Sequence, residues 1–241
     1  MNNLESIKKT QYGLHYSRLN PVGEFLPKSA ELYYDAQLYF LKGIFRGGGG
    51  VVLDIGTGGG FIDDYLLNLG ATDIDTIEID ETLYKSAVKK YEKIPEIQPL
   101  YGDITTFEFK KTYDLIIAFD VIEHISPDQG VNMLRKIYSL LNRGGMCIIR
   151  TDNMANIFVG NYSRYMDITH ATGFTEMSLQ QAFWGAGFST CTVVSPRFKP
   201  FSKLWMKYKV NSFLQEMLIR LQDRRVPQCL HKDLLCYAIK D

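Results

Sequence analysis

Three residues whose side chains could hold a metal ion or move a proton lie close together at positions 120–124. Asp120, Glu123 and His124 are spaced i, i+3 and i+4, so on a helical turn their side chains would share one face. Two carboxylates and an imidazole on one face form a ligand set suited to Mg²⁺ or Mn²⁺. The apolar run at 113–119 predicts a buried strand that brings this segment to the edge of a sheet.

A glycine-rich segment follows another apolar run, at residues 51–55. Asp54 lies near the end of this run, and glycines follow at positions 56, 58, 59 and 60. These glycines allow a tight turn and a close approach of the backbone to a ligand. The dinucleotide fingerprint G-x-G-x-x-G is not met, because its third glycine would fall at Phe61. A carboxylate at position 54 would also repel a diphosphate, whereas it tolerates a cationic sulfonium.

The segment from Val51 to Gly60 resembles the first motif of the class I S-adenosylmethionine-dependent methyltransferases. The resemblance covers roughly residues 45–195 and implies an α/β fold with a seven-stranded, mostly parallel, doubly wound sheet. We expect an N-terminal helical cap at 1–46 and a cofactor-binding methyltransferase core at 47–195. An acceptor-binding helical insertion and the last strand are expected at 196–241.

The order of apolar and amphipathic segments agrees with this fold. Strands are predicted at 51–55, 74–79, 97–101, 113–119, 146–151, 190–195 and 234–239. Helices are predicted at about 24–46, 61–69, 82–93, 127–142, 175–186 and 201–224. Thr175 is expected to cap its helix, with Gln180 and Gln181 too distant to complete a capping box.

The resemblance implies that several strand ends bind S-adenosyl-L-methionine. Glu78 is expected to accept hydrogen bonds from both ribose hydroxyls, although a strand-end acid can also cap the next helix. Asp103 is expected to accept a hydrogen bond from the adenine amino group, beside Ile104. The complete set of expected cofactor-binding residues is Asp54, Gly56, Gly58, Gly60, Glu78, Ile79, Asp103, Ile104 and Asp120.

A fourth candidate ligand, His170, lies downstream of the acid-x-x-Glu-His motif. This combination resembles the 3′-end small-RNA 2′-O-methyltransferases, in which two acids and two histidines hold Mg²⁺, and the O-methyltransferases of ubiquinone and bacterial surface-glycan pathways. It implies Asp120, Glu123, His124 and His170 as ligands of Mg²⁺ or Mn²⁺. Asp120 departs from the small-RNA pattern, which has a longer Glu at this position. Two alternatives stay open: catalysis by Glu123, His124 and His170 with a metal-free histidine base, or a structural role.

The reaction restricts the acceptor. Methyl transfer from a sulfonium is an in-line displacement, so the protein must align the acceptor oxygen and remove its proton. An alkyl hydroxyl is too weak an acid for a lone histidine, whereas metal coordination lowers its pKa. A bound ion therefore favours a vicinal diol or a catechol, which includes sugars and polyphenols.

Composition and charge limit the partners. The 241 residues suit one α/β domain with appended helices, and the four cysteines show no paired spacing. The N-terminus lacks a signal-peptide pattern, so a cytoplasmic location is expected. From residue 196 onward there are ten Lys/Arg and four Asp/Glu, a net +6, which leaves −6 on the first 195 residues because the total is zero. The acidic front part argues against a nucleic acid partner.

We expect a methyltransferase that O-methylates a small-molecule acceptor, either a sugar or an activated or lipid-linked glycan of polysaccharide biosynthesis. The basic segment 199–225 would then contact a phosphate of the acceptor or a membrane surface, or form a solvated helix face. The alternatives are a quinone-precursor or catechol O-methyltransferase at the membrane and a non-catalytic cofactor-binding module. The oligomeric state stays open. An acceptor-stacking role is considered for Trp205, Tyr208 and Phe213, and a lid role for Tyr12, His15, Tyr16 and Arg18.

Overall fold

The computed structural model describes residues 25–45 and 50–241. In chain order its elements are α2 (Lys28–Gln37), the 3-10 helix η1 (Tyr39–Leu41), β1 (Val51–Ile55), α3 (Phe61–Asn68), β2 (Asp73–Glu78), α4 (Glu81–Tyr91), β3 (Ile97–Tyr101), β4 (Tyr113–Phe119), the 3-10 helix η2 (Ile122–His124), α5 (Pro127–Leu140), β5 (Leu141–Asp152), α6 (Gly160–Met166), α7 (Glu176–Ala186), β6 (Thr192–Val194), α8 (Lys203–Arg220) and β7 (Asp233–Ile239). The lid residues expected at 12–18 lie outside the described residues.

The strands of the described residues form one seven-stranded sheet in the order β3-β2-β1-β4-β5-β7-β6. The first five strands pair in parallel, and β7 is antiparallel to both β5 and β6. Parallel neighbours end at the same edge, so the residues that follow β1, β2 and β4 come together there. The predicted seven-stranded, mostly parallel, doubly wound sheet is confirmed.

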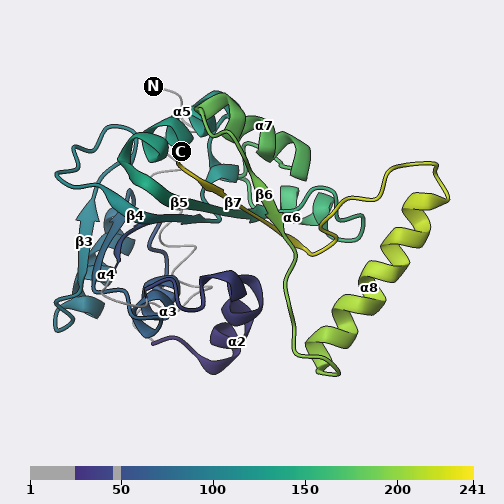
Figure 1. The fold of residues 1–241 in the computed structure, drawn as a ribbon, viewed down its shortest axis with the longest axis horizontal. Helices are drawn as coiled ribbons and strands as arrows, with labels where there is room; N and C mark the ends of the chain where they lie inside the picture. The colour runs from purple at the N-terminus through teal and green to yellow at the C-terminus, as the bar shows by residue number, and fades with distance from the viewer. Residues whose placement is uncertain (1–24, 46–49) are drawn as a thin grey trace.

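The central strands are apolar on both faces because helices cover both. Leu53 of β1 packs into the core cluster that contains Leu134 of α5 and Phe183 of α7. The adjacent Val52 packs into the opposite cluster, with Leu66 of α3 and residues of α4. Figure 1 shows this three-layer arrangement, with α5 and α7 on one side of the sheet and α2 and α3 on the other. A continuous apolar run is the sequence pattern that such a doubly covered strand requires.

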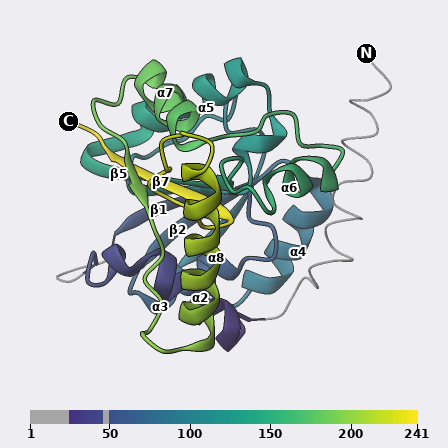
Figure 2. The same ribbon diagram turned by 90° about the vertical axis from the view of Figure 1, so that its right-hand side faces the viewer.

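Two local expectations differ from the structure. Thr175 caps α7 as predicted, but the capping box is completed by Ser178, whose hydroxyl accepts a hydrogen bond from the Thr175 N–H. A short Ser side chain at the third helical position can therefore replace the Glu or Gln that usually occupies it. The helix predicted at 201–224 forms over Lys203–Arg220, and in Figure 1 it stands apart from the body of the sheet. Figure 2 looks at the molecule from that side, with α8 in front of the sheet.

Candidate functional site

The glycine loop between β1 and α3 has backbone conformations that favour glycine. Gly56, Gly58 and Gly60 have φ angles of 85°, 52° and 73°, in the left-handed region that other residues rarely adopt. A Cβ atom on Gly56 would lie 2.6 Å from Cγ2 of Val121, which follows β4. A Cβ atom on Gly60 would overlap the Tyr91 hydroxyl of α4. The loop therefore packs closely between Val121, which follows β4, and Tyr91, at the end of α4.

Glu78, at the end of β2, faces this loop. Its carboxylate accepts hydrogen bonds from the N–H groups of Gly58, at 3.4 Å, and of Asp80, at 2.9 Å. Burial raises the pKa of Glu78, and these N–H groups oppose the increase. The cap of α4 is Asp80, whose side chain accepts from the N–H groups of Thr82 and Leu83. Because Asp80 caps the helix, the position of Glu78 agrees with the expected ribose contact.

The other expected adenine and ribose residues border the same edge of the sheet. Asp103 follows β3, and its Oδ1 accepts hydrogen bonds from the N–H and the hydroxyl of Thr105. Ile104 is buried, whereas Ile79 is 59% exposed. An exposed apolar side chain beside Glu78 is suited to contact an aromatic base.

The glycine loop is held by side chains of α4 that no sequence motif had indicated. Lys90 of α4 donates hydrogen bonds to the carbonyls of Gly59 and Gly60 and forms an ion pair with Asp64 at 2.9 Å. The Tyr91 hydroxyl donates to the Gly60 carbonyl at 2.7 Å. These bonds fix the loop from α4, about 30 residues away in the sequence, so no local motif could have predicted them.

Two carboxyl groups are fully buried beneath the loop, Asp54 of β1 and Asp63 of α3. Asp54 Oδ1 and both Asp63 oxygens accept no hydrogen bond from an N–H or hydroxyl donor in the described part of the chain. Burial raises the pKa of Asp63 to about 7, and burial, with the Asp63 charge adding, raises the pKa of Asp54 well above its usual range. Two buried acids this close cannot both ionise cheaply, so they share a proton near neutral pH. Sequence reasoning selected Asp54 and missed Asp63.

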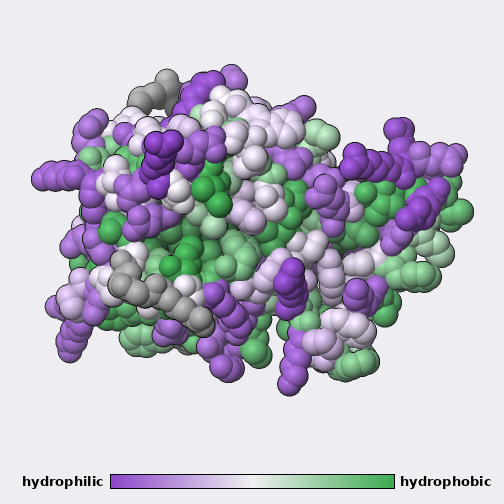
Figure 3. Space-filling view, viewed as in Figure 1, coloured by the Kyte–Doolittle hydropathy of each residue, from purple (hydrophilic) through white to green (hydrophobic). Residues whose placement is uncertain are grey.

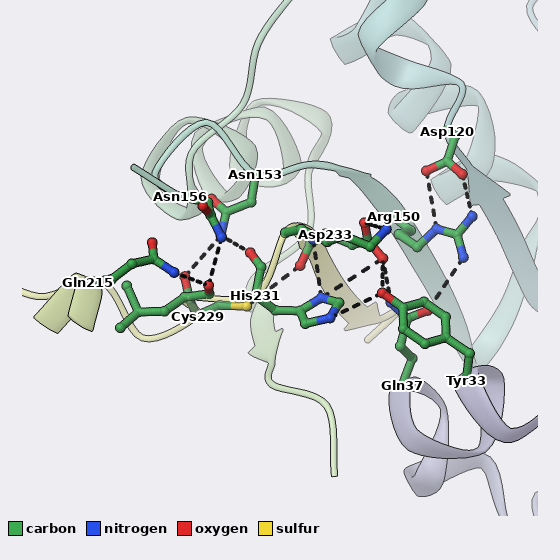
Figure 4. Close-up of polar contacts among 12 residues, drawn as sticks. Tyr33, Gln37, Asp120, Arg150, Asn153, Asn156, Gln215, Cys229, His231 and Asp233 are labelled. Atoms are coloured by element: carbon green, nitrogen blue, oxygen red, sulfur yellow. Dashed lines mark hydrogen bonds and ion pairs between the residues drawn. The ribbon is translucent and has the colours of Figure 1, made fainter. Parts of the chain in front are cut away.

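Asp120 does not lie with the other candidate metal ligands, contrary to the sequence prediction. Its backbone is left-handed, with φ of 57°, and η2 covers only Ile122–His124, so the expected helical turn over 120–124 does not form. Arg150 of β5 binds both Asp120 carboxylate oxygens through its Nε and Nη2 groups (Figure 4). Arg150 thus occupies both oxygens of this carboxylate, and Asp120 is not among the ligand atoms that lie within 4.8 Å of one another, so it is withdrawn from the ligand set.

The three remaining candidates do converge. Single ligand atoms of Glu123, His124 and His170 all lie within 4.8 Å of one another. The two imidazole rings meet edge to face, with centroids 4.8 Å apart. The Glu123 carbonyl accepts hydrogen bonds from the N–H groups of Ala171, at 2.7 Å, and Thr172, at 3.0 Å. These bonds fix the segment that carries His170 against η2.

Hydrogen bonds fix the tautomer of both histidines. The Ser163 carbonyl, an acceptor only, lies 2.9 Å from Nδ1 of His170, so this nitrogen carries a proton, and the neutral tautomer of the ring has its lone pair on Nε2. The Thr169 hydroxyl donates to Asp167 at 2.7 Å, and it therefore accepts from Nδ1 of His124 at 2.8 Å. Burial, with His170 adding, lowers the pKa of His124 to about 4. His124 is thus neutral at physiological pH, with its lone pair on Nε2.

Glu123 adds a buried oxygen to the two imidazoles. Its side chain is only 3% exposed, and Oε2 has no hydrogen-bond partner in the described residues. Burial and, second, the Asp120 charge raise the pKa of Glu123 well above its usual range. A cation beside Oε2 would reverse this effect, and carboxylate plus neutral imidazole is a donor set that divalent transition metals accept. The residues present therefore fit a divalent ion without Asp120.

The comparison with protein families gives one match to this part of the chain, a model described as a methyltransferase domain, over residues 52–145. This span contains the glycine loop, Glu78, Asp103, Glu123 and His124. Residues 52–145 therefore match a methyltransferase domain.

Curated relatives resemble the methyltransferase domain and its surroundings at low identity. The ubiquinone biosynthesis O-methyltransferase of Rickettsia akari is 30% identical over 150 residues, which are 61% of this chain and 54% of that protein. The human mitochondrial ubiquinone biosynthesis O-methyltransferase is 26% identical over 169 residues, 64% of this chain and 45% of that protein. The chain thus spans about half the length of these relatives.

Solved structures share the fold of the methyltransferase domain and its flanking elements. Magnesium protoporphyrin IX methyltransferase of Synechocystis PCC 6803, with bound SAH, superposes with a TM-score of 0.60 at 14% identity over 99% of this chain and 98% of that one. Phosphoethanolamine N-methyltransferase 2 of Haemonchus contortus, in complex with S-adenosyl-L-methionine, gives 0.59 at 15% identity over 100% of this chain and 60% of that one. Identities this low establish the fold alone.

A polar network connects the methyltransferase domain to α2 and β7 (Figure 4). Arg150 donates to Gln37 of α2 at 3.4 Å, and Gln37 donates to Asp233 of β7 at 2.9 Å. Tyr33 donates to the same carboxylate at 2.7 Å. Although burial opposes it, Lys232 and Arg150 lower the pKa of Asp233 to about 2. The network therefore stays charged near neutral pH and fixes Arg150 where it holds Asp120.

Proposed function

We propose that this protein transfers a methyl group from S-adenosyl-L-methionine to a hydroxyl oxygen of a small acceptor. One observation carries the proposal: the glycine loop after β1 packs through Gly56 against Val121, two residues before the Glu123–His124 pair. A cofactor cradled by the loop would thus lie beside the groups that can manage a proton. The methyltransferase-domain match and the cofactors named for the similar structures support the same conclusion.

The cofactor would be held by the residues that surround the loop. Gly56, Gly58 and Gly60 allow its close approach, and Glu78 accepts hydrogen bonds from the ribose hydroxyls. Asp103 and Ile104 would border the adenine. Asp54 is buried below the loop, so it would affect the charge beneath the loop and would not contact the cofactor as an exposed side chain.

A divalent ion, Mg²⁺ or Mn²⁺, would be held by Glu123, His124 and His170. When bound, it lowers the pKa of an acceptor hydroxyl and orients vicinal oxygens. The chain prepares the ligands for this role, because Ser163 and Thr169 fix the imidazole tautomers and burial keeps His124 neutral. A neutral His170 with its lone pair on Nε2 is also able to accept the hydroxyl proton.

Two acceptor classes present vicinal oxygens to such a site. A catechol, as in a quinone precursor, is favoured because both curated relatives are named as ubiquinone biosynthesis O-methyltransferases. A sugar diol of a glycan precursor is the second candidate, favoured by the basic residues of the C-terminal part, which suit a phosphate-bearing acceptor. Both acceptor classes require the same placement of an acceptor oxygen, beside Glu123 and His170.

The test measures transfer of a labelled methyl group from S-adenosyl-L-methionine in the presence of Mn²⁺. We expect methylation of 3,4-dihydroxybenzoate to exceed that of 4-hydroxybenzoate, and a nucleotide sugar with a vicinal diol to report the second acceptor class. His170→Ala should lower the rate by about 10²-fold or more. Glu123→Gln, which keeps the shape of the side chain, should lower it similarly while cofactor binding is retained.

The control is Trp184→Ala, at a half-exposed position on α7 away from the cluster. Its rate should match that of the wild type. Cofactor binding without transfer to any hydroxyl would contradict the proposal and indicate a non-catalytic binding module. Equal rates for Trp184→Ala and His170→Ala would exclude the cluster from the chemistry.

A further inference from the structure

Helix α8 carries an apolar stripe on the side that faces solvent. Its buried side chains are Gln215 and Ile219, whereas Met206, Val210 and Phe213 are 50%, 60% and 66% exposed. Together with Met217, these residues are spaced i, i+4, i+7 and i+11, which places them on one helix face. Leu214 and Leu221 widen the stripe. The face that a globular helix normally hides is here turned outward.

Buried hydrogen bonds hold the helix in this orientation. Gln215 accepts from the Ile157 N–H at 3.1 Å and donates to the Leu230 carbonyl at 2.9 Å. Figure 4 shows Gln215 pointing toward the backbone near Asn156 and Cys229. Rolling the helix to bury its apolar stripe would break these bonds and leave buried polar groups without partners. The outward stripe is therefore built into the fold.

Cations border the stripe on both sides. At 100° per residue, Lys207 flanks one edge, and Lys209 and Arg220 flank the other, while Lys203 lies at the first turn of the helix at the same angle as Leu221. Arg224 and Arg225 follow the helix, and all six side chains are exposed. Figure 3 shows hydrophobic and hydrophilic groups side by side along the protruding edge where α8 lies. An exposed apolar stripe bordered by cations is the pattern of a helix that lies in the plane of an anionic lipid surface.

We propose that α8 docks this protein onto an anionic membrane surface, with its apolar stripe among the acyl chains and its cations at the lipid phosphates. Within the residues described, no helix is both long and apolar enough to span a bilayer. A second copy of the chain fits this face less well, because symmetric pairing through the stripe would bring the flanking cations of both copies together. The acids nearby are Glu216, already paired with Arg220 at 2.7 Å, and Asp223.

The experiment is co-sedimentation of the full chain with vesicles of phosphatidylcholine alone and of equal parts phosphatidylcholine and phosphatidylglycerol. We expect at least about tenfold tighter binding to the anionic vesicles, weakened by raising NaCl from about 0.05 to about 0.5 M. Met217→Glu should lower the affinity at least about fivefold, and Lys207→Glu with Lys209→Glu at least about tenfold.

Matched variants keep the test specific. Met177→Glu changes a methionine of similar exposure on α7, and Lys89→Glu reverses an exposed cation on α4. Both should bind vesicles within about twofold of the wild type. The proposal is overturned by equal binding to neutral vesicles, by absent binding, or by equal effects of Met217→Glu and Met177→Glu. It is also overturned by a lipid-free dimer that Met217→Glu dissociates, which would make α8 an interface between copies. Methyl transfer to a soluble acceptor is measured without vesicles, so the two proposals fail separately.

Discussion

The buried carboxyl pair under the glycine loop is the residue-scale feature with the clearest consequence for stability. Asp63 keeps its proton to about pH 7 in the folded protein because it is buried, whereas the unfolded chain releases that proton near about pH 3.9. The folded state therefore binds more protons between these values, and the free energy of unfolding falls as the pH rises through this window. Two acids in one buried site destabilise the loop most when both are ionised.

Asp63→Asn tests this linkage. In the wild type we expect the free energy of unfolding to fall by on the order of 1–3 kcal/mol between pH 5 and pH 8. The variant should lose a large part of this fall, because the introduced amide does not titrate and can donate a hydrogen bond to Asp54. Thermal unfolding followed by circular dichroism at both pH values measures it. Asp128→Asn, at an exposed position on α5, should behave as the wild type, and an unchanged fall in Asp63→Asn would contradict the account.

At the residue scale, the sequence predicted the candidate ligands but not the residues that orient them. Glu123, His124 and His170 were identified from a motif, and the structure brings them within 4.8 Å. Asp120 was misplaced because its orientation depends on Arg150, which lies 30 residues away. Ser163 and Thr169, which set the tautomers, carry no pattern of their own. Their role is seen only in the folded protein, where the segment after β5 lies against η2.

At the scale of elements, the loop between β1 and α3 is sensitive to a single added methyl group. Gly60 and Gly144 both have left-handed backbones, with φ of 73° and 78°. A Cβ atom at Gly144 would meet nothing within 4 Å, whereas one at Gly60 would overlap the Tyr91 hydroxyl. The two glycines therefore separate backbone strain from the packing that shapes the loop.

Gly144→Ala should cost about 1–2 kcal/mol of stability through backbone strain alone and leave cofactor affinity unchanged. Gly60→Ala should cost more and weaken S-adenosylhomocysteine binding at least about tenfold, because Tyr91 and Lys90 must move from the loop that they support. Chemical unfolding and fluorescence titration of both variants measure the difference. Equal binding by the two variants would show that the shape of the loop does not determine cofactor affinity.

Elements covered on both faces were the easiest to predict. The strand at 113–119 agrees with the sequence prediction at both ends, because a run of apolar residues is unambiguous in a parallel sheet. After this strand, a helical turn would place the three candidate ligands on one face, but the segment begins with a left-handed Asp120. Asp120 forms an ion pair with Arg150 in this conformation, a contact between residues 30 positions apart.

For the whole molecule, the sheet order explains why the candidate site residues gather at a single edge. The strands β1, β2 and β4 end beside one another, so the glycine loop, Glu78 and the Glu123–His124 pair share one edge. The net +6 from residue 196 onward belongs largely to α8 and its flanks, away from the buried acids of the core. The proposed cofactor site thus belongs to the strand ends, and the proposed membrane-docking face belongs to α8.

The central claim, that the strand ends hold S-adenosyl-L-methionine beside a metal-binding cluster, is tested most directly by calorimetry. S-adenosylhomocysteine is titrated into the metal-free protein, and Mn²⁺ is titrated separately. We predict a dissociation constant in about the micromolar range for the nucleoside and a distinct Mn²⁺ signal that is lost in His170→Ala. Absence of S-adenosylhomocysteine binding, with and without Mn²⁺, would contradict the account.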